Sequence, residues 1–436
     1  VAEERPKVLI LDPACGTGTF LYSVMDFIRA EFMKQGDAGL WSSYVRDHLL
    51  PRLFGFELLM APYAVAHFKL GMLLAGYDLP KELQKQWQYD FEADERLGIY
   101  LTNTLDEAPS EWQKLFGAYR ILSEEANAAS RVKKDLPIMV VLGNPPYSNF
   151  GMMNRGQFIL NLLKNYKKDL NEKKLNLDDD FIKFMRWAQW RIELTGYGIL
   201  AFITNNAYLD GITHRKMRQS LLESFGEIYI LNLHGSVMKK DTCPDGSKDE
   251  NVFDIQQGVS ISIFIKSKSK NRNNLSKVYY ADLWGSREEK YSYLYKKDIT
   301  TIKWLQLESK SDYFFFVPKE FNEEIKLEYA NGWYLNQILQ LHQNGLKTDR
   351  DNLFFDFDHV ELDNRIAIFY SETEMDEAFR EKYQIKDSSS YKLLSRRLKT
   401  SYSQNNIHQC LYRPFDKRWL YYSPNLTSRP AWQVMR

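Results

Sequence analysis

A rigid turn lies at residues 144–147, which read Asn144-Pro145-Pro146-Tyr147 and follow a short apolar segment. Two consecutive prolines remove two backbone N–H groups and fix two φ angles, but they leave carbonyl oxygens that accept hydrogen bonds. The Asn144 side-chain oxygen and the Pro145 carbonyl can accept both hydrogens of a planar amine and stabilise the positive charge that develops when its nitrogen takes a methyl group. Tyr147 offers a ring for base stacking. We therefore predict that Asn144, Pro145, Pro146 and Tyr147 are catalytic residues for alkylation of an exocyclic amine.

A base in a duplex reaches such a turn only by flipping out of the stack, which costs a few kcal/mol. An aromatic ring on each face of the base would offset most of this cost, since stacking contributes about 1–3 kcal/mol per base. Phe253, just before a predicted strand, is the candidate for the ring opposite Tyr147. The alternative role for Phe253 is a loop side chain that packs on the core, and the sequence favours neither.

A second constellation lies in the segment LDPACGTGTF at residues 11–20. Asp12 ends a predicted strand, and Gly16 and Gly18 lie in the turn that opens a predicted helix. Glycines let a backbone approach a ligand closely, and the helix N-terminus behind them offers free N–H groups. Glu57 ends the next predicted strand, at the position from which a carboxylate receives ribose hydroxyls in doubly wound folds.

The ligand of this turn is better explained as a nucleoside than as a dinucleotide. A dinucleotide fingerprint needs a third small residue, but Leu21 occupies that position here. Because Asp12 directly precedes the turn, a positively charged ligand without phosphate fits better, and S-adenosylmethionine is favoured over NAD. Asn103, after the third predicted strand, is a candidate partner for the ligand's adenine amine, with a turn cap as an equal alternative. The predicted cofactor site consists of Asp12, Ala14, Gly16, Gly18, Phe20, Glu57 and Asn103.

The elements that position these residues alternate regularly over the first 270 residues. Helical patterns at 18–34 and 61–76 interleave with apolar strand-like segments. This alternation predicts an α/β, Rossmann-like fold with a largely parallel, doubly wound sheet. Ligands bind beyond the carboxyl ends of such strands, so the turn at 144–147 should face the turn after Asp12. The predicted strands are 7–14, 52–57, 98–103, 138–144, 197–206, 227–235 and 258–266.

Composition limits the class of protein. The chain has 436 residues, 44% hydrophobic and 26% charged, with a net charge of +1, which suggests two or three domains. Its three widely spaced cysteines, Cys15, Cys243 and Cys410, form no disulfide framework or metal cluster, so we expect no metal and a reducing cytoplasm. No apolar run approaches the roughly 20 residues of a membrane span, and the first residues, VAEERPK, do not have the pattern of a signal peptide. The early first strand suggests that Val1 lies inside a larger protein.

The last part of the chain has a different character. Residues 391–436 contain nine Lys or Arg against one Asp, with eight aromatic residues interleaved. A basic, aromatic segment predicts phosphate contacts, although a solvated basic face is the alternative. The candidate DNA-binding residues are Thr348, Arg350, Lys392, Arg396, Arg397, Lys399, Arg413, Lys417 and Arg418.

Together these motifs resemble the γ-type N6-adenine amino-methyltransferases of DNA. "DPACGTGTF" looks like their first motif, Glu57 their second and Asn144 to Tyr147 their fourth, while Phe253 stands where their eighth motif places a base-stacking aromatic. The segment at 198–222 also looks like their following strand and helix. The motif order, with the cofactor half before the catalytic half and a recognition domain afterwards, is the γ order.

The segments at 344–358 and 411–422 are similar to the tail of single-chain type ISP restriction-modification enzymes. In that family a nuclease and a translocating helicase precede the methyltransferase. The resemblance implies S-adenosylmethionine as cofactor, double-stranded DNA and the upstream nuclease and helicase domains as partners, and a role in bacterial restriction-modification. The implied domains are a methyltransferase domain at 1–270, a connecting segment at 271–300 and a mixed α+β target-recognition domain at 301–436.

One departure from the family concerns a motif upstream of the first strand that packs against the methionine portion of the cofactor. Only 11 residues precede Asp12 here, so we expect this motif to be missing and cofactor binding by this chain alone to be weak or absent.

Three alternative functions stay open at this point. The same turn serves enzymes that methylate a protein glutamine or a guanine amine in RNA, but these are typically compact, and the roughly 165 residues after the fold favour DNA. A cytosine amine is a second alternative, although related enzymes for cytosine usually carry Ser in place of Asn144. The third is a DNA-specificity module with an inactive methyltransferase fold, against which the intact Asn144 and Tyr147 speak.

Overall fold

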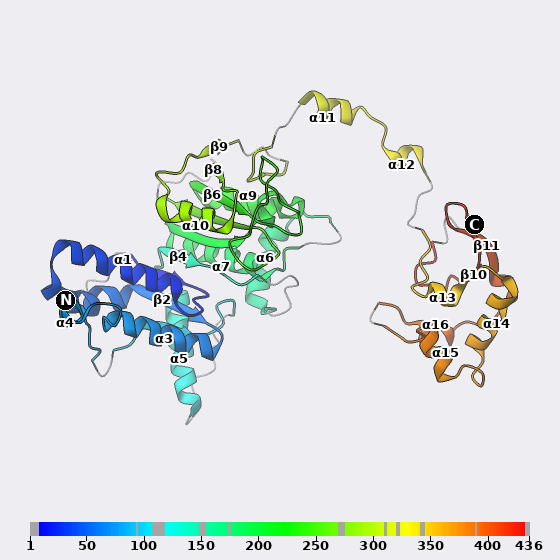
Figure 1. Cartoon of the computed structure of the whole chain (residues 1–436), viewed down its shortest axis with the longest axis horizontal. Helices are drawn as coiled ribbons and strands as arrows, with labels where there is room; N and C mark the ends of the chain where they lie inside the picture. The colour runs from blue at the N-terminus through cyan, green and yellow to red at the C-terminus, as the bar shows by residue number, and fades with distance from the viewer. Residues whose placement is uncertain are drawn as a thin grey trace. The chain divides into compact units, whose positions relative to one another are not determined.

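The computed structural model divides the chain into two compact units, Val1–Glu320 and Phe321–Arg436, each with its own hydrophobic core (Figure 1). No helix of the described residues is both long enough and apolar enough to cross a membrane. The structure describes residues 8–92, 95–106, 118–147, 154–172, 176–268, 275–308, 312–319, 323–340, 345–388 and 390–431.

Within these described ranges, the first unit is built on a nine-stranded sheet in the order β3-β2-β1-β4-β5-β7-β6-β8-β9. Strands β1 to β5 pair in parallel, and β7 runs antiparallel between β5 and β6. Strand β8 pairs with β6 in parallel, and the edge strand β9 is antiparallel to β8. The strands are β1 (Ile10–Asp12), β2 (Leu53–Glu57), β3 (Gly98–Leu101), β4 (Val140–Gly143), β5 (Gly198–Asn205), β6 (Glu227–His234), β7 (Val259–Lys266), β8 (Lys277–Asp282) and β9 (Leu305–Leu307).

The predicted α/β class with a largely parallel, doubly wound sheet is confirmed, and every strand predicted before residue 270 contributes to the sheet. The order reverses between β1 and β4, which is the switch point where doubly wound folds bind ligands. The sheet also continues through β8 and β9, so the first compact unit extends to Glu320.

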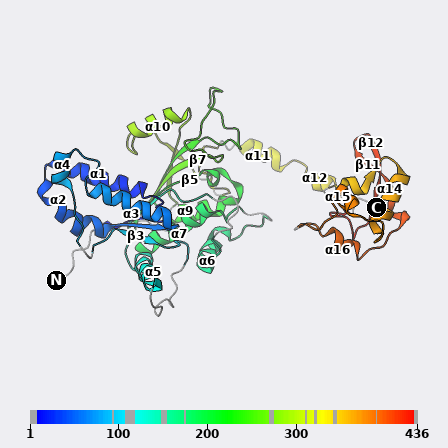
Figure 2. The same ribbon diagram turned by 60° about the horizontal axis from the view of Figure 1, so that its bottom comes forward.

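Helices cover both faces of the sheet because alternate strand residues point to opposite faces. Leu11 packs in the core cluster formed with α5, α6, α7 and α9, whereas its neighbour Ile10 packs against the cluster formed with α1 to α4. Figure 2 shows α5, α6, α7 and α9 on one side of the sheet and α10 on the other. The helices are α1 (Thr19–Gln35), α2 (Ala38–Tyr44), α3 (Met60–Leu74), α4 (Lys81–Trp87), α5 (Ala118–Lys134), α6 (Gln157–Lys167), α7 (Asp180–Thr195), α8 (Ala207–Asp210), α9 (Arg215–Ser224) and α10 (Arg287–Lys296).

The second unit is a small mixed α+β structure. Its antiparallel sheet has the order β10-β12-β11, and Leu362 and Ile366 of α14 pack against Leu420 in the core of the unit. The Asp358 carboxylate caps the N-terminus of α14 by accepting hydrogen bonds from two backbone N–H groups. The elements are α11 (Glu323–Ala330), α12 (Leu335–Ile338), α13 (Asp351–Phe354), β10 (Phe355–Asp356), α14 (His359–Tyr370), α15 (Glu377–Lys382), α16 (Leu393–Arg397), β11 (Ile407–Arg413) and β12 (Asp416–Tyr421).

Candidate functional site

The glycine turn after β1 opens directly into α1. Gly16 and Gly18 have φ angles of 55° and 76°, in the left-handed region that residues with a side chain rarely adopt. A Cβ atom on Gly18 would lie 3.3 Å from the Cβ of Ala66 in α3, so a glycine is needed for these elements to pack closely. A Cβ atom on Gly16 would meet nothing within 4 Å. The backbone of the turn therefore borders open space, with the partly exposed Phe20 in the first turn of α1.

The Asp12 carboxyl at the end of β1 is buried, with 1% of its surface exposed. Its Oδ1 accepts a hydrogen bond of 3.1 Å from the Ala14 N–H, whereas Oδ2 has no partner among the described residues. Burial, together with the negative charge of Glu57, raises the pKa of Asp12 to about 7 against the opposing hydrogen bond from Ala14. An unpaired, buried carboxyl oxygen is well matched to a ligand that brings positive charge or N–H donors.

The Glu57 carboxylate at the end of β2 holds the backbone of the same turn. Its Oε2 accepts a hydrogen bond of 2.9 Å from the Gly16 N–H, and its Oε1 accepts from the N–H groups of Leu58 and Leu59. A carboxylate has about four acceptor positions, so these three donors leave room for about one further donor on Oε2. The described residues contain no group of three or more His, Cys, Asp or Glu side chains that could hold a metal ion.

Asn103, which follows β3, makes the contacts of a turn cap. Its Oδ1 accepts a hydrogen bond of 3.1 Å from the Leu105 N–H, and its Nδ2 donates to Asp106 at 2.8 Å and to Asn154 at 3.1 Å. The neighbouring Thr104 donates its hydroxyl to the Pro13 carbonyl. Residues 103–104 therefore join the turn after β3 to the turn after β1.

The turn after β1 and the turn at 144–147 lie side by side, as the order of the predicted strands implied. Strand β4 pairs in parallel with β1, which brings the end of β4 beside Asp12. A Cβ atom on Gly143, whose φ is 151°, would lie 2.6 Å from Asp12 Oδ1. Only glycine therefore fits at position 143, and Asn144 directly follows the residue that touches the Asp12 carboxyl.

The turn at 144–147 is closed by a hydrogen bond of 2.5 Å from the Tyr147 hydroxyl to Asn144 Oδ1. Burial raises the pKa of this hydroxyl, so it stays protonated and donates. The amide oxygen has a second lone pair and can accept one more hydrogen. The Tyr147 ring packs edge-on against Phe181 of α7, with ring centroids 6.3 Å apart and an interplanar angle of 90°. Phe181 escaped sequence prediction because a phenylalanine in the first turn of a helix indicates only core packing.

Phe253 lies in the loop between β6 and β7, where it is half-buried and packs against the apolar cluster over β6 and β7, which is the alternative role considered for it. It donates its N–H to Asn251 Oδ1 at 2.9 Å. It lines a cavity of about 1040 Å³. A second cavity of about 650 Å³ is lined by Phe181 and by Asn205 at the end of β5, and both cavities are bordered by Ser236. Phe253, the proposed stacking residue, and Phe181, the partner of Tyr147, thus line adjoining cavities.

Several candidate DNA-binding residues of the second unit use their polar groups within the fold. The Arg397 side chain is buried against Phe369 and donates to the Tyr370 carbonyl. Thr348 is buried and donates to Asp351. The others of this kind are Arg350, which donates to the carbonyls of Asp349 and Gln384, Arg396, which donates to the Thr427 carbonyl, and Arg418, which pairs with Asp416.

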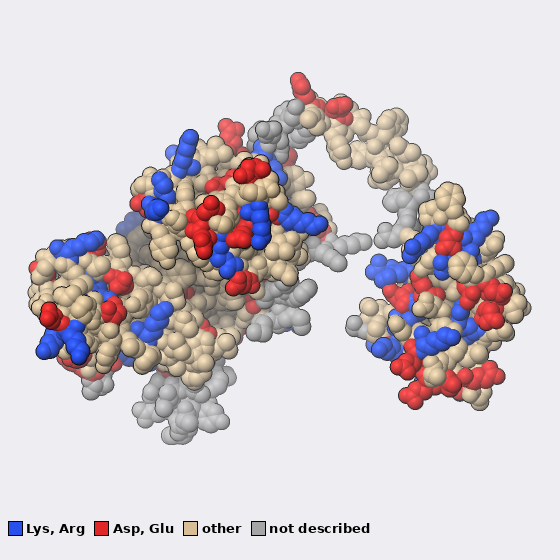
Figure 3. Space-filling model, in the orientation of Figure 1, with Lys and Arg blue, Asp and Glu red and all other residues tan. Residues whose placement is uncertain are grey.

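The remaining candidates present their charge to solvent. Lys392 and Lys399 flank α16, whereas Arg413 and Lys417 stand at the turn between β11 and β12. All four are exposed, and Figure 3 shows basic and acidic side chains interspersed on the visible face of the second unit. The basic character of the C-terminal segment is therefore divided between internal and exposed groups, which sequence composition does not distinguish.

Sequence reasoning missed three donors of α10 that contact the loop carrying Phe253: Arg287, Lys290 and Tyr291. The available signal was a Ser286 N-cap with Glu289 three residues later, which marks a helix start but says nothing of its partners.

Two family models match parts of the chain. Residues 53–237 match the Eco57I restriction-modification methylase, and residues 337–436 match the type ISP C-terminal specificity domain. No curated protein matches the chain significantly.

The chain is also similar to three solved structures over nearly its whole length. A DrdV–DNA complex is 25% identical with a TM-score of 0.61, and the ATP-dependent type ISP restriction-modification enzyme LlaBIII bound to DNA is 26% identical with a TM-score of 0.67. A nuclease-deletion mutant of the type ISP enzyme LlaGI with a DNA substrate mimic, 22% identical with a TM-score of 0.66, shares the fold. The alignments cover 96%, 97% and 97% of this chain but 41%, 28% and 35% of those chains. The chain thus spans less than half the length of these relatives.

Proposed function

The chain combines a domain of the Eco57I restriction-modification methylase family with a type ISP C-terminal specificity domain, and from this premise we propose that it methylates adenine in DNA. The proposed reaction moves a methyl group from S-adenosylmethionine to the exocyclic amine of an adenine flipped out of double-stranded DNA. The observation that supports the proposal is the close approach of the Asp12 carboxyl to Gly143, because a cationic ligand bound at Asp12 would then lie beside Asn144.

The residues around the turn after β1 fit S-adenosylmethionine, which supplies an electrophilic methyl group when bound. The unpaired Asp12 Oδ2 suits the positive part of the ligand, and Glu57 Oε2 retains an acceptor for a ribose hydroxyl. The glycine backbone at Gly16 and Gly18 allows close approach, as the open space beside Gly16 supports. Ala14, Phe20 and Asn103 complete the proposed site.

The proposed chemistry at the second turn requires no strong base. Asn144 Oδ1 and the Pro145 carbonyl accept the two amine hydrogens, which draws the nitrogen lone pair out of conjugation with the ring. As methyl transfer proceeds, these preoriented dipoles stabilise the growing positive charge on nitrogen. Pro146 keeps the turn rigid, while Tyr147 and Phe253 stack on the two faces of the base.

We propose that the second unit recognises the DNA target. The exposed Lys392, Lys399, Arg413 and Lys417 are the strongest candidates for phosphate contacts, and Thr348, Arg350, Arg396, Arg397 and Arg418 support their scaffold. The solved relatives bound to DNA support this role. In the complete natural polypeptide we expect nuclease and helicase parts that act on the same DNA, in a bacterial restriction-modification system of the cytoplasm.

The test is methylation-sensitive sequencing of DNA from cells that express the complete natural polypeptide. The expected result is N6-methyladenine at one defined sequence, absent from cells that express the Asn144→Ala variant. Methylation of cytosine instead, or of RNA or protein with unmodified DNA, would overturn the adenine assignment. Unmodified DNA together with sequence-specific DNA binding would favour the specificity module with an inactive methyltransferase fold.

A further inference from the structure

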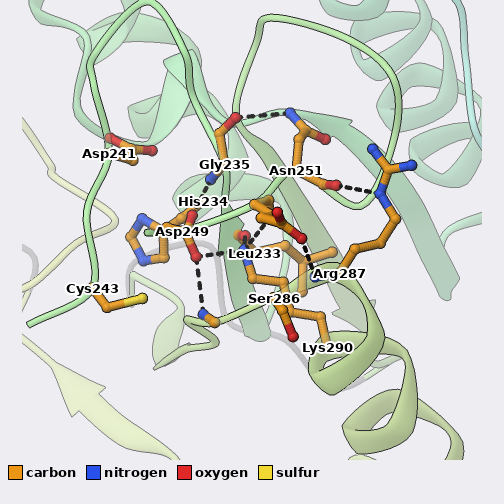
Figure 4. Close-up of polar contacts among 12 residues, drawn as sticks. Leu233, His234, Gly235, Asp241, Cys243, Asp249, Asn251, Ser286, Arg287 and Lys290 are labelled. Carbon is orange, nitrogen blue, oxygen red and sulfur yellow. Dashed lines mark hydrogen bonds and ion pairs between the residues drawn. The ribbon is translucent and has the colours of Figure 1, made fainter. Parts of the chain in front are cut away.

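Helix α10 lies against the loop of residues 235–258, which joins β6 to β7 and carries Phe253 (Figure 4). Three α10 residues face this loop: Arg287, Lys290 and Tyr291. Their spacing of three and four residues puts them on one side of the helix. All three end in hydrogen-bond donors.

These donors bind a run of consecutive loop carbonyls. Lys290 Nζ donates to the Glu250 carbonyl at 2.6 Å, and the Tyr291 hydroxyl donates to the Val252 carbonyl at 2.6 Å. Arg287 donates through Nε to the Asn251 carbonyl at 2.8 Å and through Nη2 to the Phe253 carbonyl at 3.1 Å. Each carbonyl from 250 to 253 therefore has a donor from α10, and Arg287 Nη2 also pairs with Asp254 Oδ1 at 2.8 Å.

A buried ion pair anchors the base of the loop. Lys290 Nζ lies 2.7 Å from Asp249 Oδ1, and both side chains are fully buried. Lys290 also donates to the Leu233 carbonyl, while Asp249 accepts from the N–H groups of Gly235 and Gly285. Breaking a buried pair leaves an uncompensated charge, so this contact holds the loop, the end of β6 and the start of α10 in one geometry.

Asn251 closes the loop from within. Its Nδ2 donates to the carbonyls of Gly235 at 3.0 Å and Gln257 at 2.7 Å, and its Oδ1 accepts from the Phe253 N–H. The backbone of Phe253 is therefore held on both sides, through its N–H by Asn251 and through its carbonyl by Arg287.

Helix α10 also has stabilising contacts other than those with the loop carbonyls. Ser286 and Glu289 make a reciprocal capping box at its N-terminus, and Tyr293 and Leu294 pack on the apolar cluster over β6 and β7. Leu294 follows Lys290 by four residues and Arg287 by seven, so the donors and this apolar contact share one side of α10. Arg287 is partly exposed, with 36% of its side chain accessible.

We infer that α10 is a positioning helix that holds the Phe253 backbone ready for base stacking. The inference rests on the proposed function, because it concerns how the second stacking ring is presented. A loop that is already held in place loses little conformational freedom when the base stacks. The Phe253 ring should therefore bind the base more tightly. Arg287 and Tyr291 are positioning residues that act through Phe253.

The test is a double-mutant cycle on single-turnover methylation by the complete natural polypeptide. Arg287→Gln should slow methylation about tenfold, and Tyr291→Phe, which removes one hydroxyl, about threefold. In a Phe253→Ala background either substitution should slow it further by less than about twofold, because the ring through which they act is gone. The matched controls Lys296→Gln and Tyr295→Phe, at the exposed end of the same helix, should leave the rate unchanged.

Hydrogen–deuterium exchange of the same variants provides a readout independent of catalysis. Backbone amides of residues 249–256 should exchange about tenfold faster in Arg287→Gln, with β5 and β7 unchanged. Equal slowing of methylation in both backgrounds, no effect of Phe253→Ala, or unchanged loop exchange would each overturn the inference. If the unsubstituted protein methylates no DNA, the proposed function fails instead, and the exchange result alone decides whether α10 holds the loop.

Discussion

The turn at 144–147 and the loop at 235–258 are both proposed to face the same base, but they are rigid for different reasons. The turn is stiff through its own covalent structure, since two prolines fix its backbone. The loop is stiff through its neighbour, because α10 binds its carbonyls from 250 to 253. The prolines stiffen the turn without using its carbonyl oxygens, so these acceptors remain available to a ligand. The contacts with α10 stiffen the loop but occupy its carbonyl oxygens. The first arrangement therefore suits the proposed methyl transfer, and the second suits the proposed presentation of the Phe253 ring to the base.

The largest expected effect tests the acceptors of the turn. Asn144→Ala should lower methylation by at least about 10³-fold, because it removes the oxygen that we propose stabilises the developing charge. DNA affinity should change by less than about twofold, since the substitution leaves the second unit untouched. Methyl incorporation and gel-shift titration measure the two effects, with the exposed Asn165→Ala in α6 as control. Methylation near the unsubstituted rate would reject the mechanism.

Gly235→Ala should break the loop through its backbone. The φ of Gly235 is 79°, and a Cβ atom there would lie 2.5 Å from the Asn251 Cα. We expect the free energy of unfolding to fall by about 2–4 kcal/mol, since a strained backbone and a clash combine. Urea denaturation measures this, with Gly39→Ala, where a Cβ atom meets nothing within 4 Å, as control. A loss as small as that of the control would show that the loop relaxes easily.

A pH-dependent effect extends the comparison to the Asp12 carboxyl, which lies beside Gly143. The pKa of Asp12 is raised from 3.8 to about 7, so between pH 4 and 7 the unfolded chain releases this proton while the folded chain keeps it. The stability contributed by Asp12 therefore falls as the pH rises through this window. Asp12→Asn, which does not titrate, should gain on the order of 1–3 kcal/mol relative to the unsubstituted protein from pH 4 to 7.

Thermal unfolding of both proteins across this pH range measures the difference. The exposed Asp90→Asn variant is the control for the change of charge. A constant difference for Asp12→Asn would mean that the carboxyl is ionised throughout and paired.

The smallest expected effect concerns the exposed lysines that flank α16. Replacing Lys392 and Lys399 by Gln should weaken binding to all DNA sequences alike. The slope of the logarithm of the binding constant against the logarithm of the salt concentration should become shallower by about 0.9 per lost phosphate contact. Fluorescence anisotropy at several salt concentrations measures this slope. Lys382→Gln with Lys386→Gln, in the acidic part of the same unit, is the control and should leave the slope unchanged.

Much of the first unit could be predicted because its signals are local. Strand lengths, the glycine turn and the proline turn are written in neighbouring residues, and strand pairing in a doubly wound sheet then places Asp12 beside Gly143. The contacts of α10 could not be predicted, since Arg287 reaches residues more than 30 positions earlier in the chain. Likewise, composition did not distinguish the buried Arg397 from the exposed Lys399, because burial depends on tertiary packing.

A single glycine, Gly143, separates the two proposed ligand sites. A side chain at position 143 would collide with the Asp12 carboxyl, so no bulkier residue can stand between the end of β1 and Asn144. In-line transfer of a single carbon demands that its two partners approach to within a few ångströms. The parallel pairing of β1 and β4 fixes the position of the Asp12 carboxyl relative to Gly143 through the backbone, so in the proposed reaction the sheet itself would set the separation of methyl donor and acceptor.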